Sequence, residues 1–406
     1  MSIKTYDTTK NVYQASVERI EYTFDHFDKI TLSFSGGKDS SVMFHLVMQE
    51  AIKRNRKVAV MLIDFEAQYK ATSDHAMEMF DRYKGNIDAH WICLPISLRN
   101  ASSNFEPTWT CWDEEKRGDW VREFPDHAAV VKDPSFYPFF MPGMEFEEFI
   151  ILFAEWYAEG EESANFIGIR ADESLNRFRT VATDKKTMFN GKKWTTLASE
   201  QCYNIYPIYD WKTKDIWLYH GKDPDKEHNK IYDLMHQAGV KPSQQRLCQP
   251  YGDDQRRGLW LYHILEPDTW YKVVARVNGV NSGSLYIQEN GNINGYNKIS
   301  LPEGHTYKSF CNLLLSTMPQ MTRDHYIEIF KKFLAWWVER GYEGGIPDSA
   351  PILLENKKHV PSWRRLCKVL LRNDWWGKGI GFSQPKSEAY GQFLELKRQK
   401  KAEAAA

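Results

Sequence analysis

The sequence predicts an α/β fold built on a doubly wound, mostly parallel sheet, followed by a smaller, mainly helical α+β region. Three observations support this prediction. Short apolar runs alternate with amphipathic helical patterns through the first half of the chain, which is typical of strand–helix–strand units. Residues 57–64 form a continuous apolar run that ends in an acid, as a strand buried on both faces does. Two adjacent glycines, Gly36 and Gly37, stand between a predicted strand and a predicted helix.

The predicted elements follow one another at short intervals. Helices are expected where apolar residues recur at three- and four-residue spacing, over 8–28, 42–53, 71–84 and 145–158. Strands are expected over 30–34, 57–64, 89–94, 164–170 and 204–209. Because parallel strands need a crossover connection between them, the intervening helices are expected to cover the sheet.

Two regions interrupt this alternation. Residues 100–142 are irregular, aromatic and contain proline, so we expect an insertion over a site there rather than a packed element. Residues 271–300 contain Asn-Gly and Ser-Gly pairs that predict hairpins, and 306–340 carry two strong helical patterns. We therefore expect a first domain over 1–220 and a second domain over 221–406, ending in a frayed helix.

The composition excludes several classes of protein. The formal net charge is -1, so no overall field would draw the chain to nucleic acid or to anionic lipid. No apolar run approaches the roughly 20 residues that a membrane span needs, and the N-terminus lacks the apolar core of a signal peptide. The six cysteines form no Cys-x-x-Cys pair, which speaks against a disulfide framework or a cysteine-rich metal site. A reduced, cytoplasmic protein is expected.

Residues 33–41, Ser-Phe-Ser-Gly-Gly-Lys-Asp-Ser-Ser, predict an anion-binding loop. The glycines let the backbone turn sharply toward a helix N-terminus, where amide N–H groups gather. Lys38 would add a positive charge for phosphate oxygens. Asp39 is unusual in an anion loop, and it makes sense if Mg²⁺ accompanies the phosphates. Further hydrogen-bond donors are the hydroxyl groups of Ser35, Ser40 and Ser41.

This loop is not a Walker A motif, which would need Gly at position 32 and Ser or Thr at position 39. It resembles the PP-loop of the phosphoadenosine phosphosulfate reductase family, within the adenine nucleotide alpha hydrolase-like class, through Ser35-Gly-Gly-Lys-Asp-Ser40 and Ser41-Val-Met-Phe-His-Leu46. Three further blocks follow in the order of that family: Asp64 with Tyr69, Gly168-Ile-Arg-Ala-Asp-Glu-Ser174, and Tyr206-Pro-Ile-Tyr-Asp-Trp211 with Asp215-Ile-Trp217. Four ordered blocks over 30–217 are far more specific than one glycine loop.

The resemblance implies a HUP-like PP-loop domain that grips the pyrophosphate of ATP, or the phosphosulfate end of an activated nucleotide. Asp64 and Gly168 would lie near the nucleotide, and Arg170, with Arg177 beside it, would neutralise a phosphate. ATP and Mg²⁺ are thus the expected cofactors, with Asp39 as metal ligand. The arginines could also pair with carboxylates at a solvated surface. The expected catalytic residues are Lys38, Asp39 and Arg170, and the expected phosphate grip consists of Ser33, Ser35, Gly36, Gly37, Lys38, Asp39, Ser40 and Ser41.

The chain departs from the reductases of this family in its cysteines. Those enzymes carry a nucleophilic cysteine in a short C-terminal segment, whereas this chain has no cysteine after Cys367. Cys248 lies beside Arg246, which could lower the pKa of its thiol, or it could be a small buried residue near a domain junction. The favoured function is therefore adenylylation of a substrate at the α-phosphate of ATP, with release of pyrophosphate, which could precede sulfur transfer.

Three other functions stay open. The segment Gln249-Pro-Tyr-Gly-Asp-Asp-Gln-Arg-Arg257 resembles the subgroup typified by the immunoglobulin-binding regulator IbrA, which implies a nucleotide-sensing regulator with a ParB/sulfiredoxin-like partner. Phosphoadenosine phosphosulfate reduction is a second alternative. Basic residues and tryptophans alternate over 357–378, as in a nucleic-acid binder, although a solvated helix with inward tryptophans is favoured there.

Overall fold

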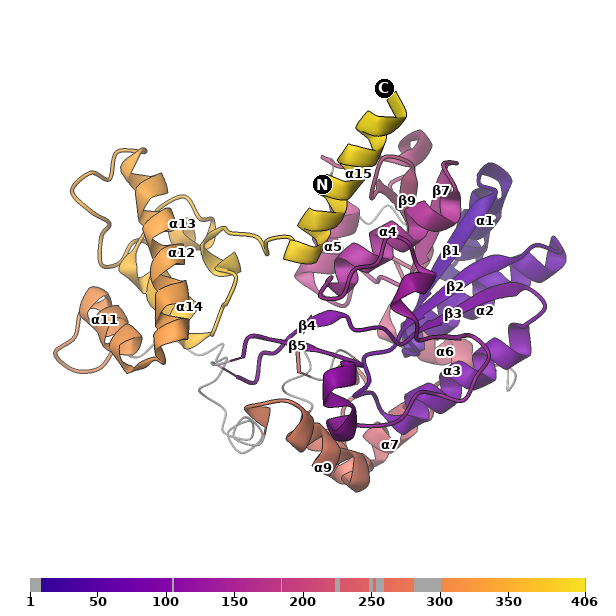
Figure 1. The fold of residues 1–406 in the computed structure, drawn as a ribbon. Coiled ribbons are helices and arrows are strands. Elements are labelled where there is room, and N and C mark those ends of the chain that lie inside the picture. Colours follow the sequence, from indigo (N-terminus) through magenta and orange to yellow (C-terminus); the bar gives the residue numbers. More distant parts are fainter. Residues whose placement is uncertain are drawn as a thin grey trace.

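The computed structural model describes residues 9–103, 106–183, 185–222, 227–247, 251–252, 259–280 and 301–405. Figure 1 shows a larger body that contains the sheet and a smaller helical lobe beside it. An extended segment leads from the lobe back to the last helix, which lies against the larger body. The two parts are described in turn.

The larger body is organised by a seven-stranded sheet with the strand order β6-β3-β2-β1-β7-β9-β8. Among these described strands every neighbouring pair is parallel except β8 with β9. The predicted doubly wound, mostly parallel α/β fold is therefore confirmed, while the antiparallel edge strand β8 was not predicted. The strands are β1 (Lys29–Phe34), β2 (Val58–Ile63), β3 (Ile87–Ile92), β6 (Val130–Val131), β7 (Ser163–Ile167), β8 (Thr195–Leu197) and β9 (Cys202–Ile205).

The strand order reverses at β1, which pairs with β2 on one side and with β7 on the other. Every residue of β2 is buried, as expected for a parallel strand covered on both faces. Open α/β sheets bind ligands at such a reversal, outside the carboxyl ends of the strands. The glycine loop leaves β1 at this point.

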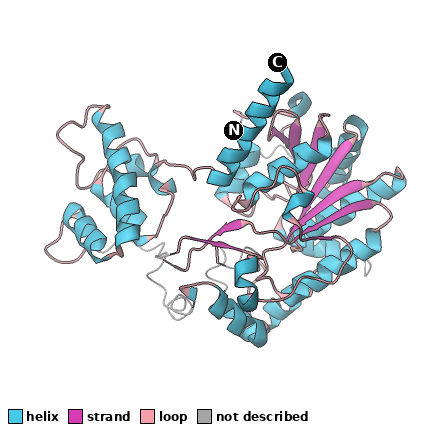
Figure 2. Cartoon of the chain, viewed as in Figure 1, coloured by secondary structure: helices cyan, strands magenta, loops and turns pink. Residues whose placement is uncertain are grey.

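Helices cover both faces of the sheet (Figure 2). α2 and α3 connect β1 to β2 and β2 to β3, whereas α4 leads back to β7 on the other side of β1. Because such crossovers are right-handed, this reversal places α4 on the opposite face. In the described part of the chain, each helix is too short or too polar to traverse a lipid bilayer. The helices of this body are α1 (Val12–His26), α2 (Lys38–Lys53), α3 (Lys70–Tyr83), α4 (Phe146–Ala158), α5 (Leu175–Ala182), α6 (Thr213–Lys222), α7 (Ile231–Gln237), α8 (Leu259–Leu265), α9 (Pro267–Arg276) and α15 (Glu388–Ala405), with the 3-10 turn η3 (Phe189–Gly191).

The segment between β3 and α4 packs more closely than the sequence predicts. β4 (Ser97–Arg99) and β5 (Thr108–Thr110) form an antiparallel ribbon, followed by the 3-10 turns η1 (Glu114–Asp119) and η2 (Pro134–Phe136) around β6. The expectation of an insertion without packed elements is wrong, because its aromatic residues are core. Those buried are Trp109, Trp112, Trp120, Tyr137, Phe139 and Phe140.

The smaller lobe is helical, and its two longest helices confirm the patterns predicted over 306–340. The hairpins predicted over 271–300 are wrong for their first part, since α9 extends to Arg276. Pro267 in its first turn is a helix-start signal. Residues 281–300 lie outside the described residues. The lobe contains α11 (Tyr307–Thr317), α12 (Gln320–Val338), α13 (Ile352–Asn356), α14 (Trp363–Leu371) and the turn η5 (Lys378–Ile380).

The buried hydrophobic residues of the described chain form two separate cores. Tyr232 of α7, Tyr262 of α8 and Val273 of α9 all belong to the core of the larger body, so the predicted domain boundary at residue 220 would cut through it. α15 also returns to this core, where Ala389 is buried. The core of the lobe is separate and is formed by α11, α12, α14 and η5, with Cys311, Tyr326, Phe330, Phe333, Trp337, Leu366, Cys367, Val369, Leu370, Trp375 and Ile380.

Candidate functional site

The glycine loop turns from β1 directly into α2, whose N-cap is Gly37. Gly36 has a φ of +68°, and a Cβ there would lie 2.7 Å from Thr72 Cγ2, so glycine is required. Gly168, just after β7, approaches α2 closely, because a Cβ on it would lie 3.2 Å from Ser40 Cα. The ends of two neighbouring strands therefore meet the first turn of α2.

A cavity of about 340 Å³ adjoins this first turn. Its lining includes residues of the loop and of the end of β7, namely Ser33, Ser35, Gly37, Lys38, Asp39, Ser40 and Gly168. The lining also includes apolar and aromatic residues, among them Met61, Ile63, Phe65, Tyr69, Phe146, Ile150 and Tyr262. Such a cavity suits a ligand that has one planar apolar part and one anionic part.

Three charged side chains meet where α2 begins. Arg170 Nε donates to Asp39 Oδ1 at 2.5 Å, and Lys38 Nζ lies 3.3 Å from Asp39 Oδ2. Lys38 Nζ also donates to the carbonyl oxygen of Gln245 at 3.0 Å. The side chains of Lys38, Asp39 and Arg170 are only 6%, 14% and 3% exposed. One carboxylate between two cations leaves a net positive charge beside the cavity.

Asp39 does not fit its predicted role as a metal ligand. One of its carboxylate oxygens accepts from Arg170 and the other faces Lys38. A protein-held Mg²⁺ would need such oxygens to be directed at the ion. No group of three His, Cys, Asp or Glu side chains gathers as a metal site within the described ranges. Asp39 instead holds the two cations in place.

The loop is fixed by residues that lie far from it in the sequence. Asn229 Nδ2 donates to the carbonyl oxygen of Gly36 at 3.0 Å. Tyr232 Oη accepts from the backbone N–H of Lys38 at 3.1 Å, and its ring lies 5.2 Å from Lys38 Nζ. His220 Nε2 donates to the carbonyl oxygen of Lys38 at 3.1 Å. None of these three residues was predicted, since single polar residues outside any motif give no sequence signal.

Ser41, predicted to bind the ligand, lies in the core instead. It is fully buried, and its Oγ lies 2.8 Å from His75 Nε2 on α3. Burial, with a smaller electrostatic contribution from the neighbouring His220, lowers the pKa of His75 to about 3. The same two causes lower the pKa of His45 on α2 to about 3. Ser41 therefore joins α2 to a neutral histidine of α3 rather than to a ligand.

Asp64, predicted to lie near the nucleotide, is also buried away from the cavity lining. Its carboxylate accepts from Trp91 Nε1 at 2.8 Å and from the backbone N–H of Glu66 at 2.9 Å. Arg122 Nη2 lies 2.5 Å from each of its oxygens. Asp64 therefore anchors the segment between β3 and α4 at the end of β2.

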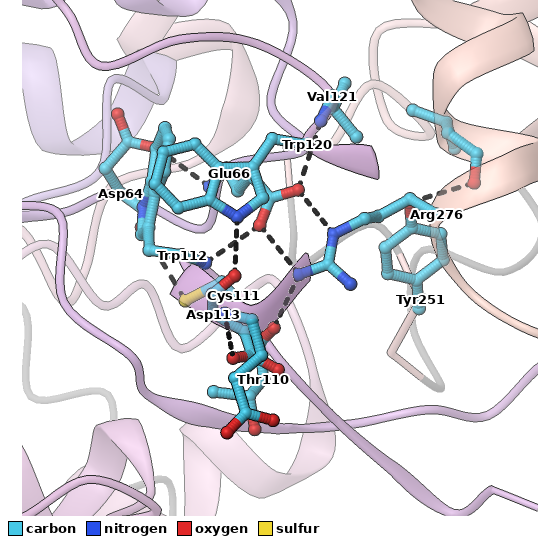
Figure 3. A network of polar contacts seen from close by, with 12 residues as sticks. Asp64, Glu66, Thr110, Cys111, Trp112, Asp113, Trp120, Val121, Tyr251 and Arg276 are labelled. Carbon is cyan, nitrogen blue, oxygen red and sulfur yellow. Dashed lines mark hydrogen bonds and ion pairs between the residues drawn. The ribbon is translucent and has the colours of Figure 1, made fainter. Parts of the chain in front are cut away.

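Glu66 makes the second half of this buried network, which Figure 3 shows together with Asp64. Its carboxylate accepts from Arg276 Nε at 2.7 Å and from the backbone N–H of Trp112 at 2.8 Å. Glu66 has a φ of +64°, which is uncommon for a residue with a side chain. Phe65 stands between the two buried acids and lines the cavity, so the network fixes one apolar wall.

Two arginines line the cavity beyond the loop. Arg177 forms an ion pair with Glu173. This agrees with the alternative prediction that these arginines pair with carboxylates. Arg246 Nη2 donates to the carbonyl oxygen of Glu173 at 2.8 Å. Both arginines nevertheless line the cavity, so an anion there would have positive surroundings. Arg170 is buried beneath the lining, where it holds Asp39.

Tyr69 is a cavity residue that the predicted site left out. Its ring stacks on that of Tyr262, with centroids 3.9 Å apart and planes 8° apart. Tyr262 Oη donates to the carbonyl oxygen of Ala67 at 2.9 Å, whereas Tyr69 Oη is buried without a hydrogen-bond partner among the described residues. Burial raises the pKa of Tyr69. Its hydroxyl therefore stays protonated and can donate a hydrogen bond to a ligand.

The described cysteines do not supply a reactive thiolate. Cys93, Cys111, Cys202, Cys311 and Cys367 are all buried. Burial raises the pKa of Cys93 and Cys111, and it raises that of Cys202 to about 11. Cys248 and the residues 249–250 and 253–258 of the adjoining predicted segment lie outside the described residues.

Comparison with known families matches two domains along the chain. The phosphoadenosine phosphosulfate reductase domain matches residues 29–238. A domain of unknown function, DUF3440, matches residues 239–350 and 343–390. An uncharacterised protein of Escherichia coli (strain K12), YbdN, is 40% identical over 406 residues, which cover 99% of this chain and 98% of that protein.

Solved structures with a partial likeness share low sequence identity with this chain. A phosphoadenylyl-sulfate reductase from Candida auris, in a phosphate complex, is 15% identical with a TM-score of 0.31, covering 54% of this chain and 84% of that one. An FMN adenylyltransferase from Candida glabrata, in complex with ATP, is 14% identical with a TM-score of 0.32, covering 57% and 62%. The U34-tRNA thiolase NcsA from Methanococcus maripaludis is 13% identical with a TM-score of 0.29, covering 71% and 83%.

Proposed function

Because this chain belongs to the phosphoadenosine phosphosulfate reductase domain family, we propose that it binds ATP in the cavity beside α2 and transfers the adenylyl group to an acceptor. One observation supports this above the others. The first turn of α2, with Lys38 at its start, contributes polar residues to a cavity whose lining also includes apolar and aromatic side chains. The polar residues suit phosphates at a helix N-terminus, and the aromatic rings suit a purine.

The proposed reaction takes place at the α-phosphorus. An oxygen of the acceptor forms a bond to it while the bond to the bridging oxygen of the β-phosphate breaks. The electron pair of that bond leaves with pyrophosphate, and the proton of the acceptor passes to solvent. Negative charge grows on the leaving oxygens, so a fixed cation there is worth most in the transition state.

We assign to Lys38 the stabilisation of the negative charge that grows on the leaving oxygens. Lys38 lines the cavity, and its Nζ is held by Asp39, by Gln245 and by the ring of Tyr232. Arg170 acts indirectly in this scheme, because it is buried and contacts Asp39 rather than the cavity. Asp39 and Arg170 are therefore positioning residues for Lys38.

A titration calorimetry experiment tests nucleotide binding. Replacing Lys38 by Ala removes a charge-assisted contact worth about 1.5–3 kcal/mol, so the affinity for ATP should fall at least roughly tenfold. Lys53 lies at the far end of the same helix and is 61% exposed, so Lys53→Ala is the matched control. Equal ATP affinity in folded Lys38→Ala protein would overturn the site.

The products distinguish adenylyl transfer from other uses of ATP. Equal amounts of AMP and pyrophosphate are expected, with water as the acceptor where no other is supplied. ADP with phosphate would mean cleavage at the γ-phosphate and would exclude the proposed reaction. Binding without any turnover would favour the regulatory alternative, for which the ParB/sulfiredoxin-like partner stays a prediction.

A further inference from the structure

The smaller lobe contains a second charged cavity, between α13, α14 and the turn η5. Its volume is about 170 Å³. Three cations line it, Arg365, Lys368 and Arg372, together with the carboxylates of Glu355 and Asp374. These residues lie in the segment matched by the domain of unknown function. None of them takes part in the site proposed for ATP.

The two carboxylates are already engaged by other groups. Glu355 accepts from Ser362 Oγ at 2.5 Å and from Arg364 Nε at 2.9 Å, one on each oxygen. Asp374 accepts from the backbone N–H groups of Lys378 and Gly379, at 3.0 Å and 2.6 Å. The acids therefore stabilise the chain around the cavity, whose lining holds three cations against two carboxylates.

Arg365 shows this imbalance most clearly. The residue is 4% exposed, and its Nη1 donates to the carbonyl oxygen of Val360 at 2.6 Å. Its Nη2 is buried and has no hydrogen-bond partner among the residues that the structure describes. A buried charged donor without a partner is costly unless a ligand supplies one. Burial also lowers the pKa of Arg365, and the charge of Glu355 opposes that shift.

Lys368 and Arg372 add positive charge to the same cavity. Lys368 Nζ lies 3.9 Å from Glu355, beyond hydrogen-bonding distance. Burial lowers the pKa of Lys368, the charge of Glu355 opposes this, and the charges of Arg364 and Arg372 add to the lowering. Arg372 is exposed, so the cavity can be reached from solvent.

We propose that this cavity binds a phosphate group, through the guanidinium groups of Arg365 and Arg372 and the ammonium group of Lys368. Guanidinium and ammonium groups are the usual protein ligands of phosphate. The phosphate could belong to a small phosphorylated molecule or to the backbone of a single-stranded nucleic acid. The nearby Trp375 is buried and stacks on His325 with centroids 3.6 Å apart, so it offers no platform for a base.

The test uses full-length protein carrying Lys38→Ala, so that anion binding at the glycine loop is weakened. Titration calorimetry with inorganic phosphate should still detect binding in this protein. Adding Lys368→Ala and Arg372→Ala should reduce that affinity at least roughly tenfold. Lys331→Ala is the matched control, because Lys331 lies in the same lobe and is 67% exposed. Absence of phosphate binding, or binding that the paired substitutions leave unchanged, would overturn the proposal.

A third substitution separates ligand binding from folding. Arg365→Met keeps an unbranched side chain of much of the original length and removes the buried charge, so the melting temperature without phosphate should not fall. Phosphate should no longer raise it. If Arg365→Met prevents folding, the substitutions at Lys368 and Arg372 still decide the question.

The source of the phosphate is tested with a short oligothymidylate in the same Lys38→Ala protein. Oligonucleotide binding that inorganic phosphate displaces would support a phosphodiester ligand. Binding of inorganic phosphate alone would support a small phosphorylated molecule.

Discussion

Arg170 and Asp39 form a buried ion pair, with Arg170 Nε 2.5 Å from Asp39 Oδ1, although 131 positions separate them in the sequence. Arg170 follows β7, and Asp39 lies in the first turn of α2. The pair therefore connects the two strand ends that meet at the cavity. It also holds the carboxylate of Asp39 beside Lys38.

Breaking this pair should destabilise the protein. Arg170→Met leaves the buried Asp39 facing Lys38 alone, and removal of one partner of a buried pair costs about 3–5 kcal/mol. Asp39→Asn should recover part of that loss, with a coupling energy of roughly 0.5–3 kcal/mol. Urea denaturation of the two single variants and the double variant measures it. Purely additive losses would show that the pair does not act as a unit.

Removal of the Tyr69 hydroxyl should weaken ATP binding without weakening the fold. Tyr69 Oη has no partner among the described residues, so Tyr69→Phe should leave the free energy of unfolding unchanged or raise it. A hydrogen bond to the ligand would be lost, at about 0.5–1.5 kcal/mol. Calorimetry with ATP measures this loss.

Tyr262→Phe is the control for that experiment. Its hydroxyl donates to Ala67, so its removal should instead lower the free energy of unfolding by about 1 kcal/mol. If ATP binds Tyr69→Phe and wild-type protein equally, the Tyr69 hydroxyl does not contact the ligand.

Cys248→Ser should leave ATP binding intact, because the loop provides the phosphate contacts. We also expect no thioredoxin-dependent sulfite from phosphoadenosine phosphosulfate, since that reaction needs a thiolate to attack sulfur. The described cysteines are buried, which leaves Cys248 as the candidate for such a thiolate. Sulfite that forms with wild-type protein and vanishes in Cys248→Ser would restore the reductase alternative.

Acid should destabilise the protein through His45 and His75. Each has a pKa of about 3 in the folded protein, against about 6.5 when unfolded. Between these values the unfolded chain binds protons that the folded chain excludes, so stability falls as pH drops below 6.5. Each histidine contributes a slope of about 1.4 kcal/mol per pH unit.

Denaturation at several pH values between 4 and 8 measures this slope. His75→Gln should reduce it by about one proton, roughly 1.4 kcal/mol per pH unit. His263 is exposed, so His263→Gln should leave the slope unchanged. An unchanged slope in His75→Gln would mean that His75 is protonated in the folded protein.

The phosphate loop could be predicted because its residues are contiguous and glycine marks a backbone requirement. Gly36 has a positive φ, and Gly168 lies very close to the backbone of α2. A residue with a Cβ would be strained at either position. The direction of a side chain could not be predicted in this way. Ser41 and Asp64 both lie near the loop. Their side chains are buried, however, where Ser41 contacts His75 and Asp64 contacts Arg122.

The partners that fix the loop could not be predicted either. Tyr232 lies in α7, and Asn229 lies two residues before that helix begins. Both come nearly 200 positions after the loop residues that they contact. Only the packing of α7 on the first core brings them there. The packing of the segment between β3 and α4 could not be predicted for a related reason, since it is held by Asp64 through Arg122 and by Glu66 through the backbone N–H of Trp112.

The return of α15 to the larger body has a consequence for biosynthesis. Ser387, just before α15, donates through its Oγ and its backbone N–H to Glu148 of α4, and Ala389 is buried in the first core. The ribosome makes α15 after the whole smaller lobe, and domains generally fold in the order of synthesis. The lobe can therefore fold on the nascent chain while the larger body still exposes the surface that α15 will cover. A chaperone that protects this surface would be needed only until α15 emerges.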